Sequence, residues 1–290
     1  MSYKVDNAVI MAAGTASRFA PLSYERPKAL IEVKGEVLIE RQIRQLREAG
    51  IPEIIVVVGY KKEQFAYLRD KFGVELVENP DYLTRNNNAS IYAVKDKLRN
   101  SYICSSDNYF STNPFELEVD DSYYAAVYAR GETKEWCMTQ GEDGYISSVQ
   151  ISGSDSWFML GHAFWNEKFS KHFLRILERV YDFPDTAGLL WESIYIAHLD
   201  ELKMKMRKYP DNVIFEFDTL DELREFDESY VCNTRSGILA AVAKELNCAE
   251  KDIVEVTAYR SADNTAAGMR FTAHGVGYEY NYETSKIRRI

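Results

Sequence analysis

The segment that decides the fold is Ala8-Val-Ile-Met-Ala-Ala-Gly14, followed by Thr15-Ala-Ser-Arg-Phe-Ala-Pro-Leu22 and, after a short gap, Arg26-Pro-Lys-Ala-Leu30. Ala8–Ala13 is interpreted as a buried strand that ends in a loop of small residues. Such a loop lets backbone N–H groups approach phosphate oxygens closely. Arg18 and Lys28 add the cations that a triphosphate needs.

Two common phosphate-binding motifs do not match this loop. The Gly-Lys-Ser/Thr end of a P-loop is missing after Gly14, and so is the G-x-G-x-x-G pattern of dinucleotide-binding folds. A single glycine followed by one arginine is also compatible with an ordinary strand–helix turn. The complete pattern, A-A-G-x-x-S-R-F-x-P with P-K-A-L after it, favours a nucleotide site instead.

Strand and helix patterns alternate through the first third of the chain. Val37–Ala49 has apolar residues at helical spacing, and Ile54–Val58 is the β-branched run typical of a strand covered on both faces. Further helices are expected at Lys61–Phe72 and Ser90–Leu98, and further strands at Val74–Val77 and Tyr102–Ser106. This order predicts an α/β fold with a doubly wound, mainly parallel, Rossmann-like sheet.

The middle of the chain predicts an inserted substrate lid. Its expected elements are strands at Tyr123–Ala129, Trp136–Gln140, Tyr145–Ile151 and Trp157–Trp165, helices at Glu167–Tyr181 and Thr186–His198, and strands at Met204–Tyr209 and Val213–Phe217. Residues 229–290 carry 8 basic and 7 acidic side chains, against 27 and 38 in residues 1–228. We therefore expect a main domain at 1–228 and a small C-terminal α+β appendage at 229–290.

Composition excludes several classes of protein. The 290 residues carry 35 Lys and Arg against 45 Asp and Glu, and this net charge of −10 argues against nucleic-acid binding. The chain start does not have a signal-peptide pattern, and no apolar run reaches the ~18 residues of a membrane span. We expect a soluble cytoplasmic protein without membrane insertion. The cysteines and histidines are scattered, without metal-ligand spacing.

Three carboxylates stand where open α/β sheets bind ligands. Asp107 follows a predicted central strand directly, at its carboxyl end. Glu216 and Asp218 alternate with two phenylalanines, so both carboxylates should share one face while both rings enter the core. Carboxylates from two strand ends can hold Mg²⁺ against a triphosphate. The structural alternative is that Asp107 begins a turn and Asp218 caps the following helix.

Motifs spread over residues 8–228 resemble the bacterial choline-phosphate cytidylyltransferases, within the sugar-nucleotidyltransferase-like superfamily. They are the glycine-rich loop, Pro27-Lys-Ala-Leu30, Val58-Gly-Tyr-Lys-Lys-Glu-Gln-Phe65, Asn86-Asn87 with Ser90, Ser106-Asp-Asn-Tyr109, Glu135-Trp136, Phe164-Trp165, Trp191 and Phe215-Glu-Phe-Asp218. The resemblance implies that residues 1–228 form a nucleotidyltransferase domain. It implies transfer of CMP from CTP to phosphocholine, which gives CDP-choline and pyrophosphate with Mg²⁺ as cofactor.

The resemblance implies that Asp107 and Asp218 are the metal ligands, and Glu216 is a third candidate because it shares a face with Asp218. In such a reaction an anionic acceptor oxygen attacks the α-phosphorus, so no general base is needed. Arg18 would neutralise the pyrophosphate, and Lys28 the α-phosphate or the acceptor, and these two assignments could be exchanged. The expected catalytic residues are thus Arg18, Lys28, Asp107 and Asp218.

CTP is expected to contact the loop at Ala12, Ala13 and Gly14. Asn87 and Ser90 resemble the nucleotide-contacting segment of the family and could hydrogen-bond the cytosine or the ribose. A run of asparagines is equally compatible with a plain loop.

The acceptor is expected to bind at Trp136, Trp191 and Glu192, since a quaternary ammonium is recognised by aromatic faces and a nearby carboxylate. The alternative for each tryptophan is core packing. The family should have an acidic residue and a tyrosine shortly before Trp191, where this chain has Gly188-Leu-Leu190. Asp185 or Glu192 could supply the missing charge.

Several further points stay open from the sequence. Ala16 stands where the loop of the family often has glycine. Residues 268–290 weakly resemble the opening strands of a choline-kinase-like small lobe, without a kinase catalytic loop, and the alternative is an element that packs or forms a homodimer.

Other acceptors are phosphoethanolamine, 2-aminoethylphosphonate or a sugar 1-phosphate. An alternative of a different functional class is a catalytically inactive nucleotide-binding regulatory protein.

Overall fold

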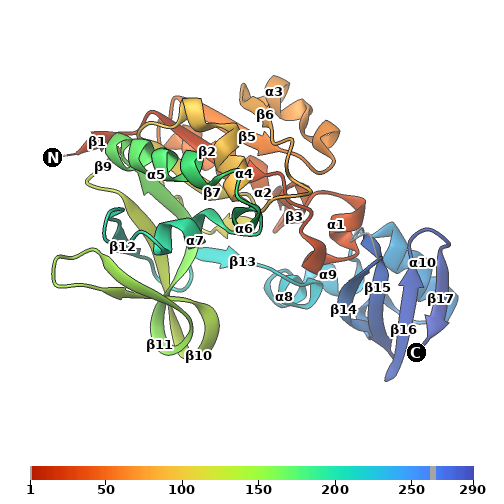
Figure 1. Cartoon of the computed structure of the whole chain (residues 1–290). Coiled ribbons are helices and arrows are strands. Elements are labelled where there is room, and N and C mark those ends of the chain that lie inside the picture. Colours follow the sequence, from red (N-terminus) through yellow and green to blue (C-terminus); the bar gives the residue numbers. More distant parts are fainter. Residues whose placement is uncertain (1, 262–265) are drawn as a thin grey trace. The chain divides into compact units, whose positions relative to one another are not determined.

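The computed structural model describes residues 2–261 and 266–290. Their contacts divide the chain into two compact units, whose elements are drawn in Figure 1. The first unit is Met1–Gly14 with Leu38–Glu216, and the second is Thr15–Val37 with Phe217–Ile290. This division differs from the boundary expected between residues 228 and 229, because it joins the segment after the glycine loop to the C-terminal residues. The expected boundary stays a prediction.

A seven-stranded sheet forms the centre of the first unit, in the order β12-β10-β11-β7-β2-β5-β6. Its strands are β2 (Asn7–Ala12), β5 (Glu53–Val58), β6 (Glu75–Glu78), β7 (Ser101–Ser105), β10 (Tyr123–Gln140), β11 (Ile146–Trp165) and β12 (Lys205–Lys208). Strands β7, β2, β5 and β6 run parallel, β12 runs parallel to β10, and β11 is antiparallel to both of its neighbours. The expected mainly parallel sheet is confirmed.

Burial on both faces explains the composition of the central strands. Val9, Ile55 and Val57 enter one hydrophobic cluster with residues of α4, α5 and α7. Their neighbours Ile10 and Val56 point to the other face and are also buried completely. Continuous apolar runs such as that of β5 are the signature of strands covered on both sides.

Helices cover the sheet of the first unit, and Figure 1 shows α4, α5 and α7 gathered on one side of it. The helical elements are α2 (Leu38–Glu48), η3 (Lys62–Phe65), α3 (Tyr67–Phe72), α4 (Asn88–Ala93), η4 (Lys95–Lys97), α5 (Glu167–Val180), α6 (Pro184–Ala187) and α7 (Trp191–Ile196). The helix expected over Thr186–His198 is divided in two, because the chain leaves helical conformation between Gly188 and Leu190. In the described part of the chain, no helix is long and apolar enough to cross a membrane.

The predicted lid strands merge into one long hairpin of β10 and β11. Its turn closes with a hydrogen bond from Gly141 N to Tyr145 O of 2.8 Å, as the turn residues predict. The strands expected to break near 130 and 153 continue through register shifts instead. Gly131, Ser152 and Asp155 have positive φ angles at these places. Such residues make bulges that bend a ladder without ending it.

Short strands complete the first unit: β1 (Tyr3–Lys4), β8 (Asn108–Phe110), β9 (Glu118–Val119) and β13 (Ile214–Glu216). β13 pairs antiparallel with β8. The expected alternation over 215–218 is only partly realised, because β13 ends at Glu216. Phe217 is buried, but Phe215 is only half-buried and packs beside Tyr109.

The second unit combines short helices with a four-stranded antiparallel sheet, β14-β15-β16-β17. Its elements are η1 (Ser17–Phe19), α1 (Leu22–Glu25), η2 (Lys28–Leu30), β3 (Glu32–Val33), β4 (Glu36–Val37), α8 (Leu220–Phe226), α9 (Ser229–Cys232), α10 (Gly237–Leu246), η5 (Glu250–Asp252), β14 (Ile253–Arg260), β15 (Ala266–Ala273), β16 (Val276–Asn281) and β17 (Lys286–Arg289). Thr219 and Glu222 form the capping box that their spacing predicts.

The close packing around Gly59 in the first unit can be tested by a substitution that adds a Cβ atom. A Cβ atom there would lie 2.7 Å from Cγ of Tyr82 and 3.0 Å from the carbonyl oxygen of Ala13. We expect Gly59→Ala to lower the free energy of unfolding by ~1–3 kcal/mol, because the Tyr82 ring must shift. Chemical denaturation measures this change.

Gly188→Ala is the matched control, because Gly188 has nothing within 4 Å of its added Cβ and a φ of −80°. We expect it to change the free energy of unfolding by less than ~0.5 kcal/mol. Equal losses in both variants would contradict the packing argument.

Candidate active site

The glycine loop leaves β2 at the carboxyl edge of the parallel strands. Met11 of β2 pairs with Ser105 of β7, and Ala12 pairs with Val58 of β5. The carbonyl oxygen of Ala13 accepts a hydrogen bond of 3.0 Å from the backbone N–H of Tyr60. Within the first unit, the predicted nucleotide residues Ala12, Ala13 and Gly14 therefore stand at the edge where open α/β sheets bind ligands.

Asp107 leaves the same edge of the first unit. It lies, half-buried, in the two-residue turn between β7 and β8. Because β7 and β2 are parallel neighbours, Asp107 and the start of the glycine loop follow adjacent strand ends. Glu216 is the exposed last residue of β13, and its Oε2 accepts a hydrogen bond of 3.3 Å from Nδ2 of Asn108.

In the second unit, Ala16 has the left-handed conformation, with φ 46° and ψ 46°. This conformation costs a non-glycine residue ~1–2 kcal/mol. Glycine adopts this conformation without that cost. A hydrogen bond of 2.9 Å from Phe19 N to Ala16 O closes the turn.

In the second unit, two predicted catalytic cations, Arg18 and Lys28, both lie next to the carboxylate of Asp218. Arg18 Nη1 lies 2.6 Å from Asp218 Oδ2, and Lys28 Nζ lies 3.9 Å from Asp218 Oδ1. The two cations differ in environment, since the Arg18 side chain is 75% exposed and that of Lys28 only 6%. Lys28 also lies over the ring of Phe19, 5.4 Å from its centroid. The structure thus gathers Arg18, Lys28 and Asp218, and their role toward phosphates stays a prediction.

The predicted metal ligands have the donor chemistry that Mg²⁺ prefers, because Asp107, Glu216 and Asp218 all offer carboxylate oxygens. Among residues 2–261 and 266–290, no group of three or more His, Cys, Asp or Glu side chains is gathered as a metal site. Mg²⁺ in proteins usually keeps several waters and binds one or two carboxylates with substrate phosphates. The residues present fit such an ion.

Asn87 contacts the candidate acceptor residues. Its Oδ1 accepts a hydrogen bond of 2.7 Å from Trp191 N, and its Nδ2 donates one of 3.1 Å to Glu192 Oε2. Ser90 is buried, and its Oγ accepts a hydrogen bond of 3.2 Å from Nδ2 of Asn79. Contacts of either side chain with a nucleotide stay a prediction.

Glu192 is a buried carboxyl group that hydrogen bonds hold from two sides. Besides Asn87, the hydroxyl of Tyr124 donates to its Oε1 at 3.2 Å. Burial raises the pKa of Glu192 to about 7, although both hydrogen bonds act in the opposite direction. This carboxyl group can therefore change charge near neutral pH. Asp185, the other candidate for the missing charge, is exposed.

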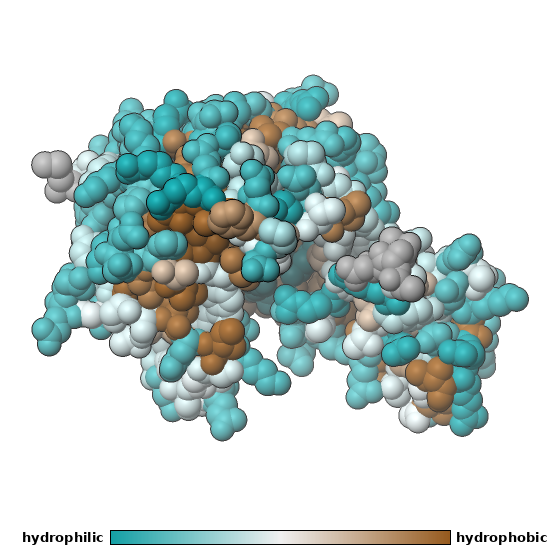
Figure 2. Space-filling view, viewed as in Figure 1, coloured by the Kyte–Doolittle hydropathy of each residue, from teal (hydrophilic) through white to brown (hydrophobic). Residues whose placement is uncertain are grey.

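Aromatic rings pack around Trp191, the residue before Glu192 in the chain. Trp191 stacks on Tyr124 with centroids 5.7 Å apart and meets Trp165 edge-on at 5.0 Å. The Trp191 side chain is 1% exposed, so it packs as a core residue, whereas Trp136 on β10 is half-buried against the same cluster. Figure 2 shows hydrophobic side chains gathered around α6, α7 and the base of the β10–β11 hairpin. Direct acceptor contacts of Trp136 and Trp191 stay a prediction.

No sequence pattern identified Tyr124 as a neighbour of Glu192 and Trp191. It lies in the apolar run that begins β10, and nothing in that run distinguishes it from other core residues. Its partners come from α7, far along the chain, so only the folded structure identifies the contact.

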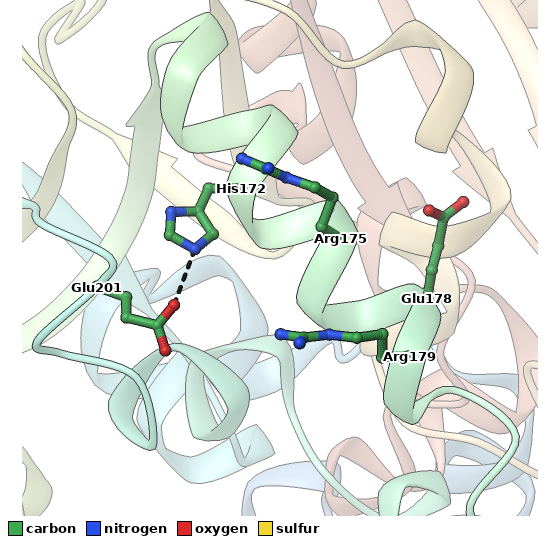
Figure 3. Close-up of a pocket in the computed structure, with 5 residues that line it drawn as sticks. All are labelled: His172, Arg175, Glu178, Arg179 and Glu201. Carbon is green, nitrogen blue, oxygen red and sulfur yellow. Dashed lines mark hydrogen bonds and ion pairs between the residues drawn. The ribbon is translucent and has the colours of Figure 1, made fainter.

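A surface hollow of about 550 Å³ lies elsewhere on the first unit (Figure 3). Its lining residues come from α5 and the segment after α7: His172, Arg175, Glu178, Arg179 and Glu201. His172 Nε2 lies 3.0 Å from Glu201 Oε2. None of the predicted site residues lines this hollow.

Comparisons with known proteins identify the family of this chain. A family profile described as the MobA-like NTP transferase domain matches residues 8–112. A choline-phosphate cytidylyltransferase of Streptococcus pneumoniae is 35% identical over 221 residues, which cover 76% of this chain and 96% of that protein. A 2-aminoethylphosphonate cytidylyltransferase of Lancefieldella rimae is 37% identical over 234 residues, 79% of this chain and 95% of that protein.

A solved structure of the CTP:phosphocholine cytidylyltransferase from Streptococcus pneumoniae has the same fold. It superposes with a TM-score of 0.74 at 35% identity, and the match covers 78% of this chain and 99% of that one. Because nearly the whole length of these relatives is matched, the chain belongs to the bacterial choline-phosphate cytidylyltransferase family of nucleotidyltransferases.

Proposed function

We propose that this protein transfers the cytidylyl group of CTP to phosphocholine, which gives CDP-choline and pyrophosphate in a Mg²⁺-dependent reaction. The observation that carries the proposal is the gathering of Arg18 and Lys28 on Asp218. Relatives that are 35% and 37% identical are cytidylyltransferases, which supports CTP as the nucleotide.

The reaction requires positive charge more than a proton acceptor. A phosphate oxygen of the acceptor attacks the α-phosphorus of CTP, the bond from the α-phosphorus to its bridging oxygen breaks, and pyrophosphate leaves. Since the attacking oxygen is already anionic, the barrier is the repulsion between anions, which positioning and fixed cations lower. Arg18 neutralises the leaving pyrophosphate, and Lys28 neutralises the α-phosphate or the acceptor.

Asp107 and Asp218 are the proposed Mg²⁺ ligands, with Glu216 as a third candidate. When bound, Mg²⁺ supplies further positive charge to the phosphates. Arg18 is exposed, so it can exchange Asp218 for a phosphate with little loss of stability, as is usual for surface ion pairs.

The environment of Glu192 supports a quaternary ammonium as the acceptor cation. Both carboxyl oxygens already accept a hydrogen bond, one from Asn87 and one from Tyr124. A trimethylammonium group needs only negative charge and aromatic faces, because it has no hydrogen to donate. A primary ammonium group needs several free acceptors.

A second candidate acceptor is 2-aminoethylphosphonate, because the relative from Lancefieldella rimae is named for it. Its primary ammonium group could donate to the remaining lone pairs of Glu192. A comparison of turnover with phosphocholine and with 2-aminoethylphosphonate distinguishes the two candidate acceptors.

Substrate specificity is tested by measuring pyrophosphate release with Mg²⁺. CTP, UTP, dTTP and ATP are each combined with phosphocholine, phosphoethanolamine, 2-aminoethylphosphonate and glucose 1-phosphate. We expect turnover with CTP and phosphocholine to exceed every other pair by at least ~10-fold, which corresponds to one missing interaction at the ammonium group. If another acceptor gives the highest turnover, that acceptor replaces phosphocholine in the proposed reaction. CTP binding without turnover of any pair would favour a regulatory nucleotide-binding protein.

Asp107 gives a test of the metal assignment. We expect Asp107→Asn to lower kcat by at least ~100-fold, because a charge that organises the phosphates is lost. The midpoint of thermal unfolding should stay close to that of the wild type. Asp120→Asn, at an exposed carboxylate of the same unit, is the control and should keep full activity. Similar kcat values for both variants would remove Asp107 from the metal site.

The raised pKa of Glu192 predicts a pH dependence of acceptor affinity. Below a pH of about 7 the carboxyl group is increasingly neutral, so its attraction for the acceptor cation is lost as the pH falls. We expect the KM for phosphocholine to rise up to ~10-fold from about pH 8 to about pH 6 in the wild type. Glu192→Gln should have a high KM with a flatter profile.

Titration of the substrate phosphate affects both proteins equally, so the difference between the two profiles isolates Glu192. Superimposable profiles would contradict its role.

A further inference from the structure

The segment that carries Arg18 and Lys28 belongs to the same compact unit as the C-terminal residues. This unit is formed by Thr15–Val37 and Phe217–Ile290. The sequence resemblance to the family ends near residue 228, and the relative from Streptococcus pneumoniae matches 76% of this chain over 96% of its own length. Relative to that protein the C-terminal residues are an addition, and they contact the segment that follows Gly14.

Several contacts join the C-terminal residues to Thr15–Val37. Tyr282 stacks on Tyr24 with ring centroids 3.9 Å apart and an interplanar angle of 16°. Glu25 accepts hydrogen bonds from Ser236 Oγ and from Ile238 N at the start of α10. These contacts fix the segment beyond the loop, around α1.

The contact at the loop itself is made by Arg260, the last residue of β14. Its Nη2 donates a hydrogen bond of 2.7 Å to Ser17 Oγ. Ser17 stands between Ala16, which has the strained left-handed conformation, and Arg18, the cation on Asp218. The guanidinium of Arg260 thus holds the one residue that connects the strained turn to the phosphate-binding cation.

A strained turn persists only when its surroundings hold it. A glycine adopts the left-handed conformation without support, but an alanine such as Ala16 needs support from its surroundings. Arg260 supplies a charge-assisted hydrogen bond at the adjacent residue, and such bonds are stronger than neutral ones. The hydrogen bond from Arg260 therefore offsets part of the cost of the left-handed conformation at Ala16.

We propose that Arg260 is a positioning residue for nucleotide binding: through Ser17 it holds the glycine-rich loop in the conformation that presents Arg18 to the triphosphate. The C-terminal sheet is then a determinant of nucleotide affinity. Arg260 itself contacts neither substrate. This inference rests on the proposed nucleotidyl transfer.

Full-length Arg260→Ala tests the proposal. We expect the KM for CTP and the Kd for CTP with Mg²⁺, measured by calorimetry without acceptor, to rise ~3- to 10-fold, the loss expected for one hydrogen bond. The KM for phosphocholine should change less than ~2-fold, since the loop binds the nucleotide. Arg260→Lys, which keeps a charged donor, should recover part of the affinity.

Arg288→Ala is the matched control. Arg288 lies in the same sheet, is 73% exposed and pairs with Glu279 Oε1 at 3.0 Å. It should leave both KM values and the Kd unchanged. Thermal unfolding of both alanine variants checks that the fold is intact.

The second variant is Ala16→Gly, combined with Arg260→Ala. Glycine removes the strain, so Arg260→Ala should lower CTP affinity less in the Ala16→Gly background than in the wild-type background. A positioning role requires this non-additivity, whereas a general loss of stability does not.

The proposal is overturned if Arg260→Ala matches Arg288→Ala, if both KM values rise together, or if Ala16→Gly has the same effect in both backgrounds. Turnover by the wild type with an unaffected Arg260→Ala variant would refute this inference alone. A wild type that binds none of CTP, UTP, dTTP and ATP would refute the proposed function and this inference with it.

Discussion

The parallel register of β2 with its two neighbours determines where the first unit can bind ligands. Because Ala12 pairs with Val58 and Met11 with Ser105, the three strands end together at one edge. Side chains on both faces are buried, so a shift of one residue would exchange the two faces throughout the core. Tight packing thus fixes the positions of the glycine loop and of Asp107, although neither belongs to the core.

Charge balance is the corresponding constraint in the second unit. Lys28 is almost completely buried, and a buried ammonium requires a counter-charge, which Asp218 supplies. Arg18 shares that carboxylate from the solvent side, where an ion pair contributes little to stability. The two cations therefore differ in mobility. Burial fixes Lys28 in place, whereas Arg18 can pair with another anion at little cost in stability.

Local patterns predicted most of the elements, because burial on one or both faces leaves a period in the sequence. The capping box at Thr219 and the central run Ile54–Val58 are examples. Two features had no local signal. The hairpin continues through residues such as Gly131 that usually end strands, because cross-strand pairing outweighs local preference. The association of Glu25 with Ser236 joins residues far apart in the chain.

The candidate acceptor site was only partly predictable, for the same reason, and Asn87 illustrates the consequence. The backbone N–H of Trp191 can only donate, so the oxygen of the Asn87 amide must face it and the amide nitrogen must face Glu192. That nitrogen favours the ionised carboxylate, as does the hydroxyl of Tyr124, while burial favours the neutral acid. Burial is the larger effect and raises the pKa to about 7, so the neutral and ionised forms are about equally populated near neutral pH. A bound cation would then decide the charge state, which makes this carboxyl group sensitive to its ligand in a way that an exposed carboxylate is not.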